Sequence, residues 1–238
     1  MIPKGLSVTL VEPQYPVNLG HTARLAKNFG IDRLYLVNPK VDMSVASIYA
    51  SHATDVLENA EVVTLSQLRR KNELLVATTA VGARRLSNVT RNSVKPEEVA
   101  GHVRSAKSAS LVFGRDTTGL TNDEIRVCDI TTVVDTGSRY RTLNISHAAA
   151  ILLYVISRGD IKALRSPSRI PRELFAENLF ALAVASRMQP HKVKHMFEAG
   201  KRMAATSQLR DDQLILLSSV LRKATGTIGE LQGLVSKT

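Results

Sequence analysis

The chain has 238 residues, of which 44% are hydrophobic and 22% charged, and it carries a net charge of +11 with a pI near 10.0. This length and composition predict one sizeable hydrophobic core and room for a second, smaller one. No apolar run approaches the roughly 20 residues of a membrane span, and the start of the chain lacks a signal-peptide pattern, so we expect a cytoplasmic protein with no membrane partner.

The positive charge is uneven along the chain and indicates a polyanionic partner. Residues 1–160 carry 19 Lys and Arg against 15 Asp and Glu, whereas residues 161–238 carry 13 against 6. A basic surface without a nucleic-acid partner is the alternative. Because aromatic residues make up only 4% of the chain and tryptophan is absent, we expect phosphate contacts rather than base stacking to supply most of any nucleic-acid affinity.

The first part of the chain alternates predicted strands and helices, a pattern typical of a parallel α/β sheet. β-branched, alternating segments predict strands over residues 7–11, 33–39 and 74–80. Helical patterns predict helices over residues 18–30, 44–50 and 65–71. We expect Asn18 to cap the first helix and Gly30 to end it, because glycine readily adopts the left-handed conformation that follows helices.

Residues 81–95 show little of the hydrophobic periodicity that is typical of a helix or a strand. The segment contains four basic residues and no acidic residue. A loop of this length is uncommon unless it closes a site or binds a ligand. We expect it to contact phosphate, and a disordered surface loop is the alternative. A helix is predicted next, from Pro96 to about Ser105.

Two more strands and a helix complete the α/β pattern. Leu111–Gly114 and Ile130–Val134 predict buried strands, and a polar loop containing glycine follows each one. An alanine-rich helix then follows residues 142–146 and runs to Arg158. Because ligands bind at the carboxyl edge of an open parallel sheet, these loops predict a binding site there.

The remainder of the chain predicts a small, basic, all-helical domain. The predicted parts are an α/β domain over residues 1–158, a basic linker over 159–170 and a helical extension over 171–238. Pro171 and Pro190 are expected to begin two helices, and Asp211 or Asp212 to cap a third.

Several familiar site patterns are absent from the sequence. It has neither a dinucleotide-binding glycine fingerprint nor a phosphate-loop lysine motif. His191 and His195 have a spacing that can hold zinc, but no third ligand accompanies them, so we expect no metal and assign both to a basic face. Cys128 has no basic or histidine neighbour in sequence and is expected to be an inert thiol.

Three motifs in a fixed order carry the most specific signal. They are Asn-x-Gly-x-x-x-Arg at 18–24, Phe-Gly-Arg-Asp-x-x-Gly-Leu at 113–120, and Thr-Leu-Asn-Ile-Ser at 142–146. With this combination, residues 5–157 resemble the SPOUT superfamily of RNA methyltransferases, in its TrmH-like branch. The length and helical character of the C-terminal extension resemble the tRNA ribose methyltransferases of that branch.

The resemblance implies an α/β fold with a deep trefoil knot formed by the last strands and helix, and a homodimer packed through the knot region. It implies that S-adenosyl-L-methionine (AdoMet) is bound in the knot loops and that its methyl group is transferred to a ribose 2′-hydroxyl. The substrate implied is tRNA, at nucleotide 32 of the anticodon loop. A ribosomal-RNA methyltransferase and a non-catalytic RNA-binding protein on the same fold are the alternatives.

The resemblance also assigns site residues by matching position. The active-site positions fall on Asn18, Arg24, Asp116, Thr142 and Asn144. The cofactor positions fall on Thr78, Thr79, Ala80, Gly114, Gly119, Val134, Thr136, Thr142, Leu143 and Ser146. We further expect seven basic residues to grip tRNA phosphates, namely Arg84, Arg85, Arg91, Lys192, Lys194, Lys201 and Arg202.

Each polar active-site residue has an expected role. A guanidinium stays protonated in proteins, so we assign Arg24 to binding the ribose or phosphate and to stabilising negative charge, rather than to proton abstraction. Asn18 and Asn144 are expected to orient Arg24 and the substrate. Asp116 is expected to anchor its loop or to pair with Arg24.

Three positions depart from the pattern of the family. Asp116 stands where glutamate is usual, and Thr142 where serine is common. Residues 134–136 read Val-Asp-Thr where Ile-Pro-Thr or a similar sequence is usual. The required chemical groups are kept, and we expect Asp135 to shift cofactor affinity or base preference.

Overall fold

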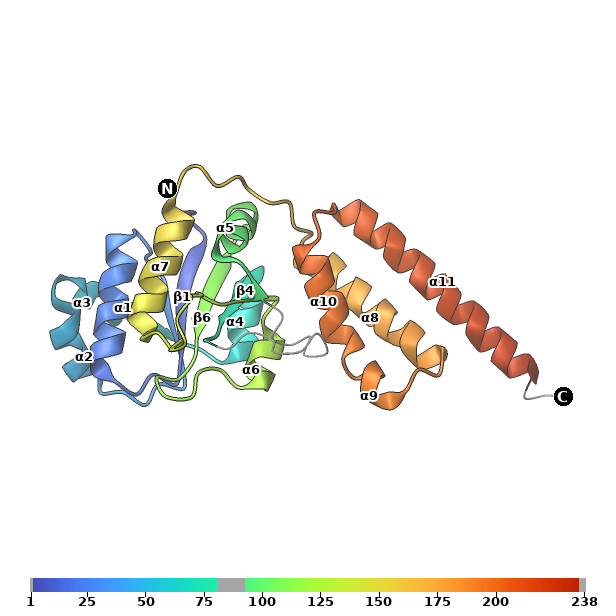
Figure 1. Ribbon diagram of the computed structural model, residues 1–238, viewed down its shortest axis with the longest axis horizontal. Helices are drawn as coiled ribbons and strands as arrows, with labels where there is room; N and C mark the ends of the chain where they lie inside the picture. Colours follow the sequence, from blue (N-terminus) through green and yellow to red (C-terminus); the bar gives the residue numbers. More distant parts are fainter. Residues whose placement is uncertain (1, 81–92, 236–238) are drawn as a thin grey trace. The chain divides into compact units, whose positions relative to one another are not determined.

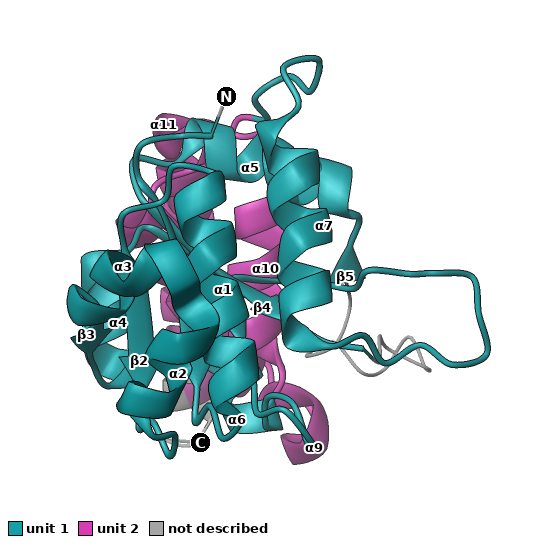
Figure 2. Cartoon of the chain, turned by 90° about the vertical axis from the view of Figure 1, so that its left-hand side faces the viewer, with its two compact units in different colours: residues 1–164 teal, residues 165–238 magenta. Residues whose placement is uncertain are grey.

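The computed structural model of the protein describes residues 2–80 and 93–235 (Figure 1). The chain divides into two compact units, residues 1–164 and 165–238 (Figure 2). Unit 1 contains a sheet with helices, and unit 2 is helical. None of the described helices has the length and apolarity needed to cross a membrane.

In the described part of unit 1, seven strands form one parallel sheet with the order β3-β2-β1-β6-β4-β7-β5. The strands are β1 (Leu6–Val11), β2 (Leu34–Val37), β3 (Glu61–Val62), β4 (Leu74–Thr78), β5 (Ser93–Val94), β6 (Ala109–Phe113) and β7 (Ile130–Thr132). The parallel α/β sheet expected from the sequence is confirmed. The end of the predicted 81–95 loop is strand β5, and residues 81–92 lie outside the described part of the chain.

The central strands are buried along their whole length, so both faces of the sheet must be covered. Two layers of helices cover them. In one layer, α7 (Ile145–Ser157) contacts both α1 (Pro16–Asn28) and α5 (Pro96–Ser105). Outside α1 lie α2 (Met43–Ala50), the 3-10 helix η1 (Ser51–Ala53) and α3 (Thr54–Glu58). The other layer consists of α4 (Leu65–Lys71) and α6 (Asn122–Val127), whose buried residues share a core cluster with the strands.

The start of α1 differs from the sequence prediction. The N-cap is Tyr15 and Pro16 occupies the first turn, so Asn18 lies inside the helix and does not cap it. Proline favours this place because its fixed φ suits the helix and its missing N–H is not needed there. The amide of Asn18 is therefore left for contacts with other segments. Gly30 adopts a φ of +69° just after the helix, as predicted.

Unit 2 is built from α8 (Arg169–Ala185), α9 (Pro190–Val193), α10 (Met196–Thr206) and α11 (Asp211–Val235). Its core contains Phe175, Ala204 and Leu214. The helix predicted from Pro190 is divided into α9 and α10. The predicted capping role of Asp211 is wrong, because its carboxylate accepts hydrogen bonds from the N–H and hydroxyl of Ser168, and Asp212 pairs with Arg210.

The close packing of α1 against α2 depends on Gly20. A Cβ at this position would lie 2.5 Å from the Cβ of Tyr49 and 2.6 Å from the carbonyl oxygen of Ala46. We expect Gly20→Ala to lower the free energy of unfolding by about 1–3 kcal/mol, because the helices must move apart. Calorimetry of the full chain measures the effect.

The control is Gly226→Ala in α11, where a Cβ would meet nothing within 4 Å. Alanine is favoured over glycine in a helix interior by about 0.5–1 kcal/mol, so this variant should be slightly more stable than the parent. A Gly20→Ala protein with unchanged stability would contradict the close packing of α1 on α2.

Candidate active site

Four neighbouring strands, β1, β6, β4 and β7, bring their carboxyl ends to one edge of the sheet. A cavity of about 260 Å³ lies at this edge, lined by the ends of β4, β6 and β7, the segments that follow them and the start of α7. Open parallel sheets bind ligands at this place because loops from adjacent strands converge there. A cavity therefore lies at the edge of the sheet where the sequence predicts a binding site.

Eight of the ten predicted cofactor positions line this cavity: Thr78, Thr79, Ala80, Gly114, Gly119, Val134, Thr142 and Leu143. Thr136 and Ser146 do not line it. Thr136 is exposed, and its hydroxyl accepts a hydrogen bond from the N–H of Ser138. Ser146 is buried in the first turn of α7 and donates to Asn144.

The cavity also has walls that the sequence analysis missed. Ile145, Ala148 and Leu152 of α7 line it, and their i, i+3, i+7 spacing is the pattern that could have identified them. The other unpredicted lining residues are Phe113, Arg115, Thr117, Thr118, Leu120, Thr132 and Arg141. The site is thus apolar on its α7 side and polar on the side of the loop after β6.

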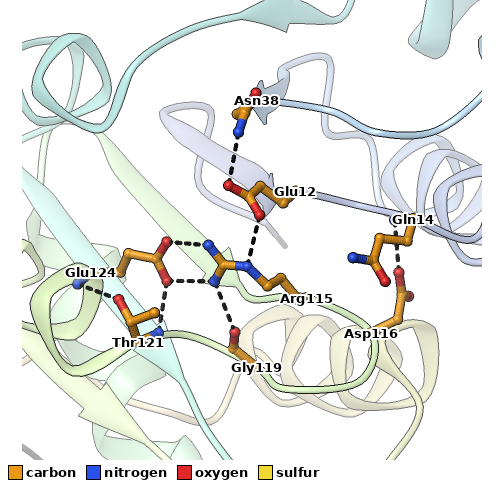
Figure 3. Close-up of polar contacts among 8 residues, drawn as sticks. All are labelled: Glu12, Gln14, Asn38, Arg115, Asp116, Gly119, Thr121 and Glu124. Atoms are coloured by element: carbon orange, nitrogen blue, oxygen red, sulfur yellow. Dashed lines mark hydrogen bonds and ion pairs between the residues drawn. The ribbon is translucent and has the colours of Figure 1, made fainter.

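Asp116 joins the loop after β6 to the segment after β1. One carboxylate oxygen accepts a hydrogen bond from the backbone N–H of Gln14 at 2.9 Å (Figure 3). The same oxygen accepts from the backbone N–H of Tyr15 at 3.2 Å. The other oxygen accepts from the side-chain amide of Asn18. Asp116 therefore anchors its loop, and the structure has no ion pair between Asp116 and Arg24 among the described contacts.

Asn18 continues this connection to the third motif. Its Oδ1 accepts from Nδ2 of Asn144 at 2.8 Å, and Oδ1 of Asn144 accepts from the N–H of Ser146 at 2.8 Å. The Asp116 carboxylate can only accept and the Ser146 N–H can only donate, so the two ends of the chain fix the orientation of both amides. Residues of all three motifs therefore form one directed hydrogen-bond chain.

Arg24 lies apart from this hydrogen-bond chain and does not line the cavity. It follows Asn18 by six residues on α1, which places it about 9 Å farther along the helix and on a different face. Asn18 is buried, whereas Arg24 is exposed and forms no hydrogen bond or ion pair with another described residue. The structure therefore brings Asn18, Asp116 and Asn144 together, and among the described contacts neither Asn18 nor Asn144 bonds Arg24.

Arg115 also holds the loop after β6, through contacts with different segments from those that Asp116 contacts (Figure 3). Its Nε donates to Glu12 at 2.8 Å, and its two terminal nitrogens donate to the two oxygens of Glu124 at 2.9 Å each. One terminal nitrogen also donates to the carbonyl oxygen of Gly119 at 3.3 Å. A bidentate arginine–carboxylate pair is directional, so these contacts, which we call the Arg115 clamp, fix the shape of the loop.

The Arg115 clamp shifts the pKa of each of its charged groups. Hydrogen bonds from Arg115 and Asn38 hold the pKa of Glu12 below its usual value. Burial raises the pKa of Glu124, but hydrogen bonds from Arg115 and Thr121 outweigh it and leave this pKa below its usual value. The carboxylates in turn raise the pKa of Arg115. All three groups are therefore charged at neutral pH.

Loss of charge at Glu124 tests the clamp. We expect Glu124→Gln to lower the free energy of unfolding at pH 7 by about 1.5–3 kcal/mol, the contribution of hydrogen bonds to a charged group. Because the pKa of Glu124 is lowered on folding, its contribution is present above about pH 4.3, its unfolded pKa, and is lost as the pH falls through the lower folded value. The variant should therefore lose less stability than the parent on acidification. Denaturant unfolding at pH 7 and pH 3 measures both effects.

Asp123→Asn is the matched control, because Asp123 is in the same helix and its pair with Arg126 is at the surface. Exposed pairs contribute little, so this variant should resemble the parent at both pH values. Equal effects of the two substitutions would show that the Arg115 clamp contributes no more to the free energy of unfolding than an exposed ion pair does.

The basic residues predicted to grip phosphates have different positions. Lys192 and Lys194 are exposed at α9. Lys201 and Arg202 are only 5% and 7% exposed, so the structure contradicts the prediction for these two. Both residues lie in α10, which packs against α8. Arg84, Arg85 and Arg91 lie outside the described residues.

Comparisons with known proteins agree with this geometry. The SpoU rRNA Methylase family matches residues 5–154. The tRNA (cytidine-2′-O-)-methyltransferase TrmJ of Sulfolobus acidocaldarius is 28% identical over 223 residues and covers 92% of each chain. The enzyme of the same name from Methanocaldococcus jannaschii is 36% identical over 161 residues, covering 66% of this chain and 69% of its own. The crystal structure of TrmJ from Z. mobilis superposes with a TM-score of 0.66 at 23% identity, covering 91% of this chain and 97% of that one, and shows the same fold.

Proposed function

We propose the function of this chain from its family, because the chain belongs to the SpoU rRNA Methylase family. It is an RNA methyltransferase, and we propose that it methylates the ribose 2′-hydroxyl of tRNA, as the names of its relatives state for them. The observation that carries the proposal is the hydrogen-bond chain from Asp116 through Asn18 to Asn144, which joins three separate motifs beside the cavity.

The cavity residues fit AdoMet as the methyl donor, which supplies a methyl group on a positively charged sulfur when it is bound. The apolar wall of Leu143, Ile145 and Leu152 suits the flat adenine ring. A Cβ at Gly119 would meet no atom within 4 Å, so this loop residue leaves open space beside its backbone. Gly114 has no such space, because a Cβ there would lie 2.2 Å from the N atom of Leu120, and only glycine allows this close turn.

Positioning is the main contribution that we assign to the protein in methyl transfer. Alignment of the 2′-oxygen with the methyl carbon supplies much of the rate in such a displacement, so a rigid site is favoured. The carboxylate of Asp116 already accepts three hydrogen bonds and acts as an anchor rather than a proton acceptor. Thr142 lies at the cavity wall, where its hydroxyl can contact the bound substrate or donor.

We propose that Arg24 binds the substrate through its guanidinium group, which stays protonated and donates charged hydrogen bonds. Its guanidinium has no partner among the described residues and does not line the cavity of its own chain. We propose a homodimer packed through the knot region, in which Arg24 takes part by acting at the site of the second copy. We propose nucleotide 32 of the anticodon loop as the target, a position that rests on the family resemblance, and Lys192 and Lys194 as phosphate contacts.

Methyl transfer to unmodified tRNA tests the proposed function. Incubation of the full chain with labelled AdoMet and tRNA transcripts should give a single ribose methylation at nucleotide 32, mapped by mass spectrometry. Arg24→Ala should lower the transfer rate by at least about 100-fold, because the variant loses a charged hydrogen-bond donor to the reacting substrate. Arg33→Ala is the control, since Arg33 is exposed at the opposite edge of the sheet, just before β2.

The outcomes separate the alternatives. Transfer to ribosomal RNA but not to tRNA would overturn the proposed substrate and keep the chemistry. A protein that binds RNA without binding AdoMet would overturn the enzyme assignment. Equal activity of Arg24→Ala and Arg33→Ala would overturn the role of Arg24.

A further inference from the structure

The segment between β7 and α7 carries an aromatic residue that the fold does not use. Residues 135–142 are exposed throughout, and this segment projects from unit 1 as an open loop leading into α7 (Figure 2). Tyr140 within it is 78% exposed, the highest value among the large apolar residues in the described chain. Its ring therefore contributes little to the core and is accessible to a ligand.

The neighbours of Tyr140 indicate the chemistry of its ligand. Arg139 and Arg141 flank it in sequence and are exposed, so the loop presents one aromatic side chain and two guanidinium groups to solvent. This combination suits single-stranded nucleic acid, because the ring can stack on a base while the guanidinium groups bind phosphates. The one acidic residue of the loop, Asp135, accepts a hydrogen bond from the N–H of Gly137, so it does not pair with either arginine among the described contacts.

The position of this loop connects it to the active site. Arg141 and Thr142 line the cavity. Tyr140 immediately precedes Arg141 in the chain and does not line the cavity. Adjacent Cα atoms are about 3.8 Å apart, so a nucleotide held at the cavity is within reach of the Tyr140 ring. The loop also has internal support, because the N–H of Tyr140 donates to the hydroxyl of Ser138 at 3.1 Å.

We propose that Arg139, Tyr140 and Arg141 form an RNA-binding tip at the rim of the cavity. Tyr140 stacks on a base beside the acceptor ribose, and the two arginines hold the neighbouring phosphates. The tip selects an unpaired stretch of RNA, because a base inside a duplex offers no free face to the ring. This inference rests on the proposed function and adds the way in which the site recognises its RNA substrate.

Binding of tRNA to the full chain tests the tip. Tyr140→Ala should weaken tRNA binding by about 5- to 150-fold, the range that corresponds to loss of one base–aromatic stack, and leave AdoMet affinity unchanged. Tyr140→Phe keeps the ring and should bind within about twofold of the parent. Tyr140→Leu keeps apolar bulk without a π face and should resemble Tyr140→Ala.

Two further measurements separate stacking from other roles. Replacing Arg139 and Arg141 together by glutamine should reduce the slope of log affinity against log salt by about 0.7 for each lost phosphate contact. Photo-crosslinking of tRNA that carries 5-iodouridine beside the acceptor nucleotide should label Tyr140, as mapped by peptide mass spectrometry.

Each alternative result has a definite meaning. A parent protein that neither binds nor methylates tRNA overturns the proposed function and this inference with it. An active parent whose Tyr140→Ala variant binds tRNA equally well overturns the tip alone. If Tyr140→Ala instead changes the oligomeric state, as measured by light scattering, the loop is a contact between copies of the chain and the RNA role is wrong.

Discussion

The carboxylate of Asp116 is the contact on which the active site depends. It accepts hydrogen bonds from the N–H groups of Gln14 and Tyr15, just before α1, and from the side chain of Asn18 inside it. The N–H groups of Gln14 and Tyr15 precede the helix, and Asp116 supplies their acceptor from a distant segment. Without Asp116, the loop after β6 would lose its hydrogen bonds to the start of α1, and the amide of Asn18 would lose the acceptor that fixes its orientation.

The sheet makes this contact possible by placing β1 beside β6 in parallel. Segments about 100 residues apart in sequence then leave the same edge side by side. Arg115 and Asp116 are consecutive residues at the start of the turn that the Arg115–Gly119 bridge closes, and their side chains contact different segments. Arg115 contacts Glu12 and Glu124, whereas Asp116 contacts the start of α1 (Figure 3). The loop is held from both sides, and its remaining surface is left to line the cavity.

Local patterns in the sequence predicted most strands and helices, and the family resemblance predicted about half of the residues that line the cavity. The contacts of Asn18 and Arg115 could not be predicted in the same way, because they depend on which strands are neighbours in the sheet. The burial of Lys201 and Arg202 was missed because the charge of a residue does not reveal whether tertiary packing covers it. The apolar wall of α7 was predictable from its spacing. The trefoil knot stays a prediction, since threaded chains are too rare to be derived from local patterns.

The most direct test of the account is the affinity of the full chain for AdoMet after Asp116→Asn, measured by calorimetry beside Asp116→Glu. Both carboxylate oxygens face N–H donors, so asparagine must turn its own NH₂ group toward a donor. We predict that Asp116→Asn weakens AdoMet binding at least about 10-fold, the equivalent of about 1.4 kcal/mol, and speeds hydrogen exchange at residues 14–18. Asp116→Glu keeps both acceptors and should bind nearly as the parent does. An Asp116→Asn protein with unchanged AdoMet affinity and unchanged exchange would contradict the central role of this carboxylate.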